Sequence, residues 1–378
     1  MTAVPPDPAH WLVPPTRHDV HLRPRVVVLG GDGIGVEVMA AAVECLKALD
    51  LPIDIATPAH GAASVREHGE AYPIEARAAV EAADAVLFGA IDTGPAGQCR
   101  PILRHLRFGL RTYANLRPAV SLPRLSAITG DGRTNLVIVR ELTEDLYPGC
   151  EGDLEELGRR WPGLEDRAGR AIPASGKFAI RVITEEASRR VGEYAARLAA
   201  HRRDLGISAG HVTIVGKANV LCETDGLFAS ACESELAAHG GLTWNTLYVD
   251  EAARRLVAKP FSFDVIVTSN LFGDILSDVA SEVMGGLPMA PSGAIGDGAA
   301  YFEPCHGSAP DLVGRGIANP SGALLSAAMM LSFLGFRHPA AKLAAAVVAA
   351  IAGGCRTSDR GGSASTADLT NAVCRLLA

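Results

Sequence analysis

The chain has 378 residues, of which 48% are hydrophobic and 20% charged, and its formal net charge is −7. This length and composition predict a folded protein with a core large enough for two domains. The acidic balance argues against nucleic acid as a partner, and no apolar run reaches the roughly 18 residues of a membrane span.

The start of the chain and its cysteines bear on location. Residues 1–24 contain six prolines and little periodicity, which predicts a flexible, loosely held extension. They lack the basic region and apolar stretch of a secretory signal. The eight cysteines are scattered without a C-x-x-C pair, so neither a zinc site nor a disulfide framework is implied. We therefore expect a cytoplasmic protein.

From residue 25 onward, short apolar runs alternate with segments of helical period. The expected strands are 26–29, 85–88, 136–139, 179–183, 212–215 and 263–268, and the expected helices are 35–49, 185–200, 225–239, 271–283 and three stretches after Pro320. This alternation predicts an α/β protein. Residues 148–176 are instead charged and rich in turn formers, which predicts a protruding insertion, either a floppy surface loop or an interface arm.

A glycine-rich turn, Gly30-Gly-Asp-Gly-Ile-Gly-Val-Glu-Val38, follows the first expected strand. It lies where a dinucleotide fingerprint would lie. However, Gly31, Gly33 and Gly35 give G-x-G-x-G rather than G-x-G-x-x-G, and no acidic residue ends a second strand about 20 residues later. The motif therefore favours a tight strand-to-helix turn over a Rossmann pyrophosphate site.

Arginines gather in one region and at the end of one apolar strand: Arg100, Arg104, Arg107, Arg111, Arg117 and Arg140. The second, third and fourth of these recur at i, i+3 and i+7, on one face of an expected helix. A solvated basic face would explain those three, but not Arg140 after Val-Ile-Val. Guanidinium groups suit multidentate capture of carboxylates, so we expect a small polyanionic substrate.

Two carboxylates, Asp274 and Asp278, lie four residues apart in a helix expected to begin near Leu271. At this spacing like charges share one face and repel by roughly a few tenths of a kcal/mol. They could simply face water. Their apolar neighbours favour a cationic partner instead, and Mg²⁺ binds carboxylate oxygens together with water and substrate.

Two further residues and one loop could complete a site. Lys217 follows an expected strand, and Tyr147 lies seven residues past Arg140. Each alone would be explained as structural, but beside a metal and an arginine cluster they could be an acid–base pair. The turn-rich segment 302–320 is either a surface loop or, with free backbone groups before a helix, a cradle for an adenine nucleotide.

Taken in order, these motifs identify a resemblance. From about Arg25 to the C-terminus the chain closely resembles the β-decarboxylating dehydrogenases, the isocitrate, isopropylmalate and homoisocitrate dehydrogenase family. The resemblance rests on Gly31-Asp-Gly-Ile-Gly35, Tyr113-Ala-Asn-Leu-Arg-Pro118, residues 137–147, Lys217-Ala-Asn219, residues 264–278 and His306-Gly-Ser-Ala-Pro-Asp311. It implies two α/β domains with a cleft between them, and not a standard Rossmann fold.

The resemblance also implies a domain division. Residues 25–112 with 286–378 would form a large cofactor-binding domain. Residues 113–285 would form a small domain that binds substrate and makes a homodimer or a tetramer, with 148–176 as an insertion or arm. The active site would be shared across the dimer interface.

Carried over position by position, the resemblance implies a role for each site residue. Arg107, Arg117 and Arg140 would bind the malate part of the substrate, with Arg104 and Arg100 as further contacts. Asp250, Asp274 and Asp278 would hold Mg²⁺ or Mn²⁺. Tyr147, Lys217 and Asp250 would be catalytic, the last two supplied by the partner subunit. The residues near NAD would be Thr93, Asn219, Glu303, His306, Gly307, Ser308, Ala309, Asp311 and Asn319.

The implied reaction is oxidative decarboxylation. A hydride would leave C2 of the substrate for the nicotinamide while Lys217 relays away the hydroxyl proton, and Tyr147 would protonate C3 after CO₂ departs. NADP-dependent members of the family carry lysine and tyrosine where this chain has Asp311 and Leu312, so NAD is the expected cofactor.

Family members differ in the γ group on C3. In this chain Arg104 stands three residues before Arg107, which looks like the homoisocitrate branch and favours an anionic γ group. Residues 92–100 and the insertion depart from that branch, so isopropylmalate or a phosphonate analogue of isocitrate are alternatives. A non-catalytic regulatory subunit is another, but such subunits usually lose a metal aspartate, the tyrosine or the lysine.

Overall fold

The structure is a computed structural model that describes residues 6–15, 23–92, 100–122 and 133–378. Within these residues ten strands form one mixed sheet. In spatial order they are β2 (Asp54–Ala56), β1 (Arg25–Leu29), β3 (Ala85–Phe88), β12 (Ala300–Pro304), β11 (Pro291–Ile295), β4 (Ala114–Val120), β5 (Asn135–Glu141), β10 (Val265–Thr268), β8 (His211–Gly216) and β9 (Thr243–Tyr248). The predicted α/β class is confirmed.

The sheet joins two groups of parallel strands. β2, β1, β3 and β12 form one group, and β5, β10, β8 and β9 form the other. β11 and β4 run antiparallel to their neighbours and connect the groups. In the second group the carboxyl ends of all four strands meet at one edge of the sheet, which is where parallel α/β sheets bind ligands.

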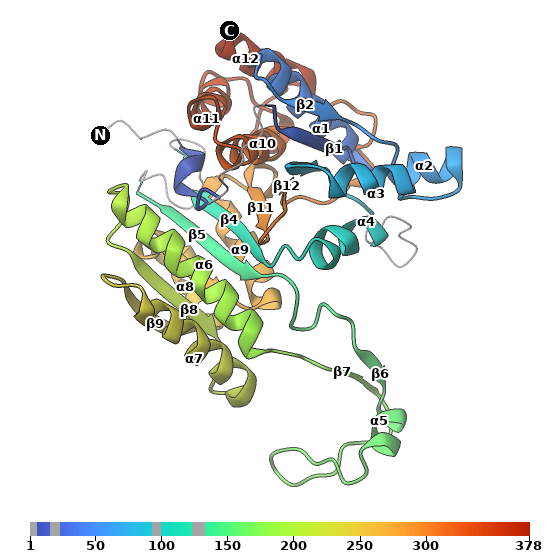
Figure 1. The fold of residues 1–378 in the computed structure, drawn as a ribbon, viewed down its shortest axis with the longest axis vertical. Coiled ribbons are helices and arrows are strands. Elements are labelled where there is room, and N and C mark those ends of the chain that lie inside the picture. The colour runs from blue at the N-terminus through green and yellow to red at the C-terminus, as the bar shows by residue number, and fades with distance from the viewer. Residues whose placement is uncertain (1–5, 16–22, 93–99, 123–132) are drawn as a thin grey trace.

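Both faces of the sheet are buried under helices (Figure 1). Alternate residues of one strand enter different apolar clusters: Val137 and Val139 of β5 pack in one, and Leu136 and Ile138 in another. The helices of the first half, which contains β1, are α1 (Ile34–Ala48), α2 (Gly61–His68), α3 (Ile74–Glu81), α10 (Ser321–Phe333), α11 (Arg337–Ala352) and α12 (Thr366–Leu377). The helices of the second half, which contains β5, are α6 (Glu185–Asp204), α7 (Cys222–Ala238), α8 (Val249–Ala258) and α9 (Asn270–Met284).

Helix α10 lies at the centre of the first half. Its residues are apolar or small on every side and nearly all are buried, as expected for a core helix. It packs against α1, α11, β11 and β12, so the loop that precedes it is anchored to the sheet. Short helical turns complete this half: η4 (Leu287–Met289), η5 (Pro310–Leu312) and η6 (Ser358–Arg360).

Residues 6–15 are packed against the body, so the expectation of a loosely held extension is wrong for them. The turn η1 (Pro8–His10) contacts α10 and α11. Trp11 and Leu12 are fully buried, and the guanidinium of Arg202 on α6 donates a 2.7 Å hydrogen bond to the carbonyl of His10. The prolines make the sequence resemble a disordered segment, but the buried side chains of Trp11 and Leu12 hold it against the core.

Residues 148–176 project from the second half of the molecule (Figure 1). Two short strands, β6 (Glu151–Asp153) and β7 (Lys177–Ala179), pair as an antiparallel ribbon, and α5 (Leu154–Arg160) follows β6. No residue of α5 is buried. Only Ala179 of the expected strand 179–183 is in a named strand, because the chain leaves the ribbon there; Val182 forms an isolated bridge with Asp145, and α6 begins at Glu185.

Candidate active site

The site begins with polar side chains on one face of the central strands. Arg117 on β4 and Arg140 on β5 are both almost completely buried. Nε of Arg117 donates a 2.7 Å hydrogen bond to Asn115, whose amide donates to Ser292 on β11 at 3.0 Å. Asn115 lies opposite Arg140 across the β4–β5 ladder. Charged groups buried in this way cost folding energy unless they are paired, which indicates a functional role.

Helix α9 is built around Arg140. Nε and Nη2 of Arg140 donate to Oδ1 of Asn270 at 2.9 and 2.7 Å, and Nη1 donates to Oδ1 of Asp274. A Cβ at Gly273 would lie 2.6 Å from Cγ of the same arginine. A side chain at position 273 would therefore push the helix off the arginine. The predicted helix is confirmed, and it places Asp274 directly beside the end of β5.

Tyr147 meets the same carboxylate. Its phenol donates a 2.6 Å hydrogen bond to Oδ2 of Asp274, and its ring centroid lies 5.0 Å from Cζ of Arg140 and 5.9 Å from Cζ of Arg107. Burial, reinforced by the hydrogen bond to Asp274, raises the pKa of Tyr147 to about 12. The phenol is therefore protonated at neutral pH and can act as a proton donor.

Arg107 approaches from the opposite side, near Tyr301 and Glu303 of β12. Burial disfavours its charge, but these two groups outweigh that effect and raise the pKa of Arg107. Likewise Cys305, Glu303, Asp274 and Asp278 hold the pKa of Arg117 above its usual range despite burial. Nε of Arg107 is buried without a hydrogen-bond partner among the described residues. An anion bound between these arginines would satisfy it.

The single helical face expected for Arg104, Arg107 and Arg111 is not formed. Helix α4 (Arg100–Arg104) changes into a π-helix, η2 (His105–Gly109), and Arg111 follows in a left-handed conformation with φ 53°. The wider π turn breaks the α-helical period, so the three arginines no longer share one helical face. Arg111 lies 3.9 Å from Glu186 in an exposed pair, whereas Arg104 and Arg100 are exposed at the rim, before the half-buried Arg107.

Asp274 and Asp278 lie one turn apart on α9, as expected. Burial works against the charge of Asp274, yet Arg140 and the Tyr147 hydrogen bond lower its pKa. Partial burial, with repulsion from Asp274, raises the pKa of Asp278. Two carboxylates at this spacing suit a hard divalent cation. Among the residues described, no three His, Cys, Asp or Glu side chains gather into a metal site, so within one chain the set has two carboxylates.

Lys217 and Asp250 form an ion pair with each other. Lys217 follows β8 and Asp250 lies in the first turn of α8, after β9. Strand β10 separates β8 from β5, which puts Lys217 roughly 10 Å from Arg140 across the sheet at about 4.8 Å per strand. Neither residue bonds to Tyr147, Asp274 or Asp278 in the described chain. The structure therefore contains two separate sets of expected catalytic residues.

The loop after β12 packs against the glycine turn after β1. The amide of Ile34 donates to the carbonyl of Ser308 at 2.9 Å, and a Cβ at Gly33 would lie 2.1 Å from that oxygen. At Gly31 a Cβ would lie 2.1 Å from the carbonyl oxygen of Ala90, after β3. Backbone thus packs closely against both glycines, and the predicted tight turn is confirmed.

This loop carries several of the expected cofactor residues. His306 is buried, and its Nε2 has no hydrogen-bond partner in the part of the chain described. Burial lowers the pKa of His306 and keeps the ring neutral. Gly307 and Asp311 are exposed, and Ala309 is left-handed with φ 38°. Because Nε2 of His306 has no partner here and the neighbouring loop is exposed, this position suits a ligand that makes a hydrogen bond to the ring.

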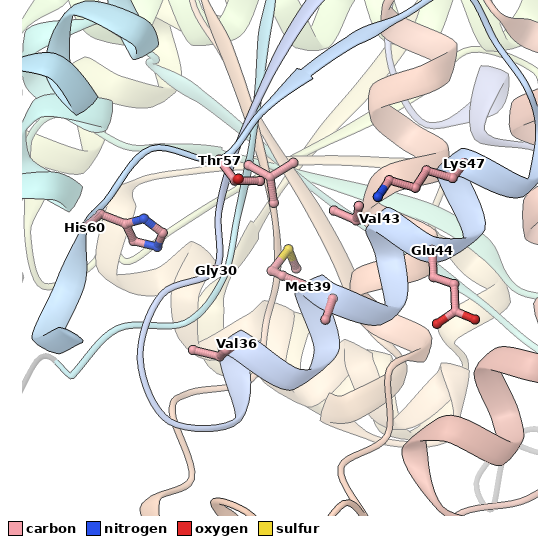
Figure 2. A pocket seen from close by; sticks show the side chains of 10 residues that line it. Gly30, Val36, Met39, Val43, Glu44, Lys47, Thr57 and His60 are labelled. Atoms are coloured by element: carbon pink, nitrogen blue, oxygen red, sulfur yellow. The ribbon is translucent and has the colours of Figure 1, made fainter. Parts of the chain in front are cut away.

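A pocket of about 660 Å³ lies next to this loop, between it and the start of α1 and α2. It is lined by Gly31, Asp32, Gly33, Val36, Glu37, Ala62, Ala63, Arg66, Asp92, Ser308, Pro310, Val313 and Gly314. A second, more apolar pocket of about 520 Å³ lies between α1 and residues 57–60 (Figure 2). There His60 accepts a hydrogen bond from the amide of Gly31 at 3.0 Å, so its ring supports the glycine turn.

The remaining expected cofactor residues are dispersed. Oδ1 of Asn319 accepts from the amide of Ser321 at 3.0 Å and its Nδ2 donates to Asp359 at 2.9 Å. Its side chain is thus engaged within the chain. Asn219 is exposed in the turn after Lys217. Glu303 lies among the arginines, where burial raises its pKa. Thr93 lies outside the described residues.

No helix in the described ranges is both long and apolar enough to cross a membrane.

Comparisons with known proteins agree with this arrangement. Residues 25–373 match the Isocitrate/isopropylmalate dehydrogenase family. The 3-isopropylmalate dehydrogenase of Archaeoglobus fulgidus is 40% identical over 356 residues, covering 93% of this chain and 99% of that protein. The Isocitrate/homoisocitrate dehydrogenase of Thermus thermophilus is also 40% identical over 356 residues, covering 93% and 98%. A crystal structure of isocitrate dehydrogenase from Methylococcus capsulatus gives a TM-score of 0.81 at 32% identity, covering 93% and 99%.

The fold and the similarities define the class of protein as a dehydrogenase that couples oxidation of a hydroxy acid to loss of CO₂. The chain belongs to the isocitrate/isopropylmalate dehydrogenase family and is a β-decarboxylating dehydrogenase. The similar proteins divide between isopropylmalate and isocitrate or homoisocitrate, so membership leaves the γ group open.

Proposed function

We propose that this enzyme catalyses the NAD-dependent, Mg²⁺- or Mn²⁺-dependent oxidative decarboxylation of a 3-substituted malate whose γ group is anionic. The observation that carries the proposal is the convergence of three arginines, the buried Arg117 and Arg140 and the half-buried Arg107, on the Tyr147–Asp274 pair. Guanidinium groups gathered out of water in this way favour bound anions, and the two carboxylates of a malate would supply them.

Arg104 supports the anionic γ group. It is exposed, at the end of α4, three residues before the half-buried Arg107. From that rim its guanidinium can pair with a negative group on C3 of a bound acid, and Arg100 at the start of α4 is a further substrate contact. An apolar isopropyl group would gain nothing from a cation there. Isopropylmalate, named for the Archaeoglobus relative, is the second candidate substrate.

Asp274 and Asp278, with Asp250 of a second subunit, would hold the metal, which supplies Lewis-acid polarisation of the substrate oxygens when bound. The chain's own residues then divide the proton transfers. Lys217 would relay away the proton of the 2-hydroxyl while the hydride on C2 passes to NAD. Tyr147 delivers a proton to C3 once CO₂ has left, since its raised pKa keeps the phenol protonated.

We infer that the active unit is a homodimer. The separation of the Lys217–Asp250 pair from Tyr147 and Asp274 within one chain supports this, because each pair would then complete the site of the other subunit. In this arrangement residues 25–112 with 286–378 bind cofactor, residues 113–285 bind substrate and the partner, and residues 148–176 serve as an arm.

NAD is the proposed cofactor, bound at the loop of His306, Gly307, Ser308 and Ala309, with Thr93, Asn219, Glu303 and Asn319 as further contacts. Asp311 supports NAD over NADP because an exposed carboxylate can accept hydrogen bonds from ribose hydroxyls but repels a 2′-phosphate. Such repulsion is worth on the order of tenfold to a hundredfold in specificity. Initial rates with NAD and NADP test this, and equal kcat/KM for the two would contradict it.

The experiment that tests the function is a substrate panel. The purified protein is assayed with isocitrate, homoisocitrate, isopropylmalate and a phosphonate analogue, each with NAD and Mn²⁺, and CO₂ release is measured beside NADH formation. Stoichiometric formation of both products from an acid with an anionic γ group is the expected result. Oxidation without CO₂, or no turnover of any acid, would refute the proposal, and the latter would return the non-catalytic subunit to consideration.

A further inference from the structure

A buried ionic cluster lies behind the site at the root of the arm, and the residues assigned to substrate, metal and cofactor do not include it. Its centre is Arg181, two residues after β7. Nε of Arg181 donates to Oδ1 of Asp145 at 2.6 Å, and Nη1 donates to Oδ1 of Asp225 at 2.5 Å. Nη1 also donates to Thr224 and Nη2 to Ser269, each at 3.0 Å. The two carboxylates are almost completely buried.

The second oxygen of each carboxylate, Oδ2, accepts a hydrogen bond from a backbone amide at or near an expected site residue. Oδ2 of Asp145 accepts from the amide of Leu271 at 2.9 Å, in the first turn of α9 and three residues before Asp274. Oδ2 of Asp225 accepts from the amide of Lys217 at 2.5 Å. Through these two carboxylates, the guanidinium of Arg181 links the start of α9, which carries Asp274, to the turn that carries Lys217.

Asp145 is itself held in an unusual conformation. Its φ is 73°, a left-handed value that L-residues other than Asn and Asp seldom adopt. Its amide donates to the carbonyl of Val182 at 2.9 Å and its carbonyl accepts from the amide of Val182 at 3.2 Å. Tyr147 follows two residues later. The strain at Asp145 persists because Arg181, Leu271 and Val182 fix it from three sides.

We propose that Arg181 is a positioning residue that aligns, through Asp145 and Asp225, the Tyr147–Asp274 pair of its own subunit and the Lys217 turn. The proposal rests on the proposed function for the roles of Tyr147 and Lys217. If those roles hold, one arginine adjusts both sets of catalytic groups, and therefore both active sites of a dimer.

Hydrogen exchange tests the geometry without needing activity. In Arg181→Met, amide exchange should accelerate in residues 143–149, 216–221 and 269–274 and stay unchanged in the cofactor loop 305–313. The matched control is Arg202→Met, which breaks another buried pair, Nε of Arg202 to Oδ1 of Asp264 at 2.6 Å, near the opposite ends of the same strands. It should destabilise the protein without accelerating exchange in the three segments. Wild-type exchange of these segments in Arg181→Met would overturn the proposal.

Kinetics test the catalytic consequence. Misplaced catalytic groups cost about 100-fold in rate, so Arg181→Met should lower kcat by that order while the KM for NAD stays constant. Arg202→Met should keep kcat per folded subunit. If Arg181→Met does not fold, Asp145→Gly replaces it, because glycine accepts φ 73° without strain and only the carboxylate is lost. A wild-type kcat in Asp145→Gly would overturn the proposal; a wild type inactive on every acid would refute the proposed function but leave the exchange result decisive.

Discussion

Tyr147 and Asp274 share a 2.6 Å hydrogen bond, from the phenol to Oδ2, while the other carboxylate oxygen accepts from Arg140. One carboxylate therefore orients the expected proton donor and the expected substrate arginine, and it is also an expected metal ligand. A bound cation would compete with both donors for the oxygens of Asp274, so binding of metal and substrate should loosen the phenol from its resting partner and free it to face C3.

Replacement of Tyr147 by phenylalanine removes the donor and leaves the ring between Arg140 and Arg107. Loss of a general acid typically costs 10² to 10⁴ in rate, so kcat should fall on that order with the KM for NAD unchanged. Steady-state kinetics measure this. A Tyr147→Phe enzyme with wild-type kcat would show that another group protonates the product.

Metal binding can be measured without an activity assay, through the unfolding temperature. Mn²⁺ should raise the unfolding temperature of the wild type, because a ligand that binds only the folded state stabilises it. Asp278→Asn should abolish most of that rise while the metal-free unfolding temperature stays near that of the wild type, since Asp278 is exposed. Activity should be lost in excess EDTA. An equal Mn²⁺-induced rise in both proteins would contradict the assignment of Asp278.

The shared site predicts complementation between two inactive variants. Tyr147→Phe and Lys217→Met should each be inactive alone. After unfolding and refolding together, mixed dimers contain one intact site, so the mixture should regain about a quarter of wild-type activity in a two-fold dimer. Each variant refolded alone is the control. If the mixture stays as inactive as its components, Lys217 serves its own chain.

His306 should make the apo protein less stable in acid. Burial lowers its pKa from the ordinary value of 6.5 in the folded state, so below pH 6.5 the unfolded chain binds the proton more readily and folding stability falls. His306→Gln removes this contribution. Urea unfolding at pH 8 and pH 5.5 should show a smaller loss for the variant than for the wild type. Equal losses would mean that the ring is not held neutral by the fold.

Much of this arrangement follows from local sequence. The apolar run 263–268 was expected to be a strand, and residues Val265–Thr268 of it form the buried strand β10. Helical spacing correctly placed Asp274 and Asp278 one turn apart on a single helix. Arg140 is expected in the site because a charge at the end of an apolar strand has few structural explanations, and the structure buries it near the end of β5.

The features that were missed depend on contacts distant in the chain. The bond from Arg181 to Asp145 spans 36 residues and that from Arg181 to Asp225 spans 44, and no spacing rule links them. The π-helical turn is instead a local feature: a Cβ at Gly109 would lie 2.3 Å from the imidazole of His105. Trp11 packs under α10 and α11, which are more than 300 residues away in sequence.

The comparison of two substrates on two proteins tests the central claim most directly. Wild-type kcat/KM should be higher for isocitrate or homoisocitrate than for isopropylmalate. Arg104→Val should lower it for the anionic acids by roughly tenfold or more, since each 1.4 kcal/mol of lost pairing is tenfold, while activity on isopropylmalate holds or rises. A wild type that prefers isopropylmalate to every acid with an anionic γ group would contradict the account and assign the enzyme to the isopropylmalate branch.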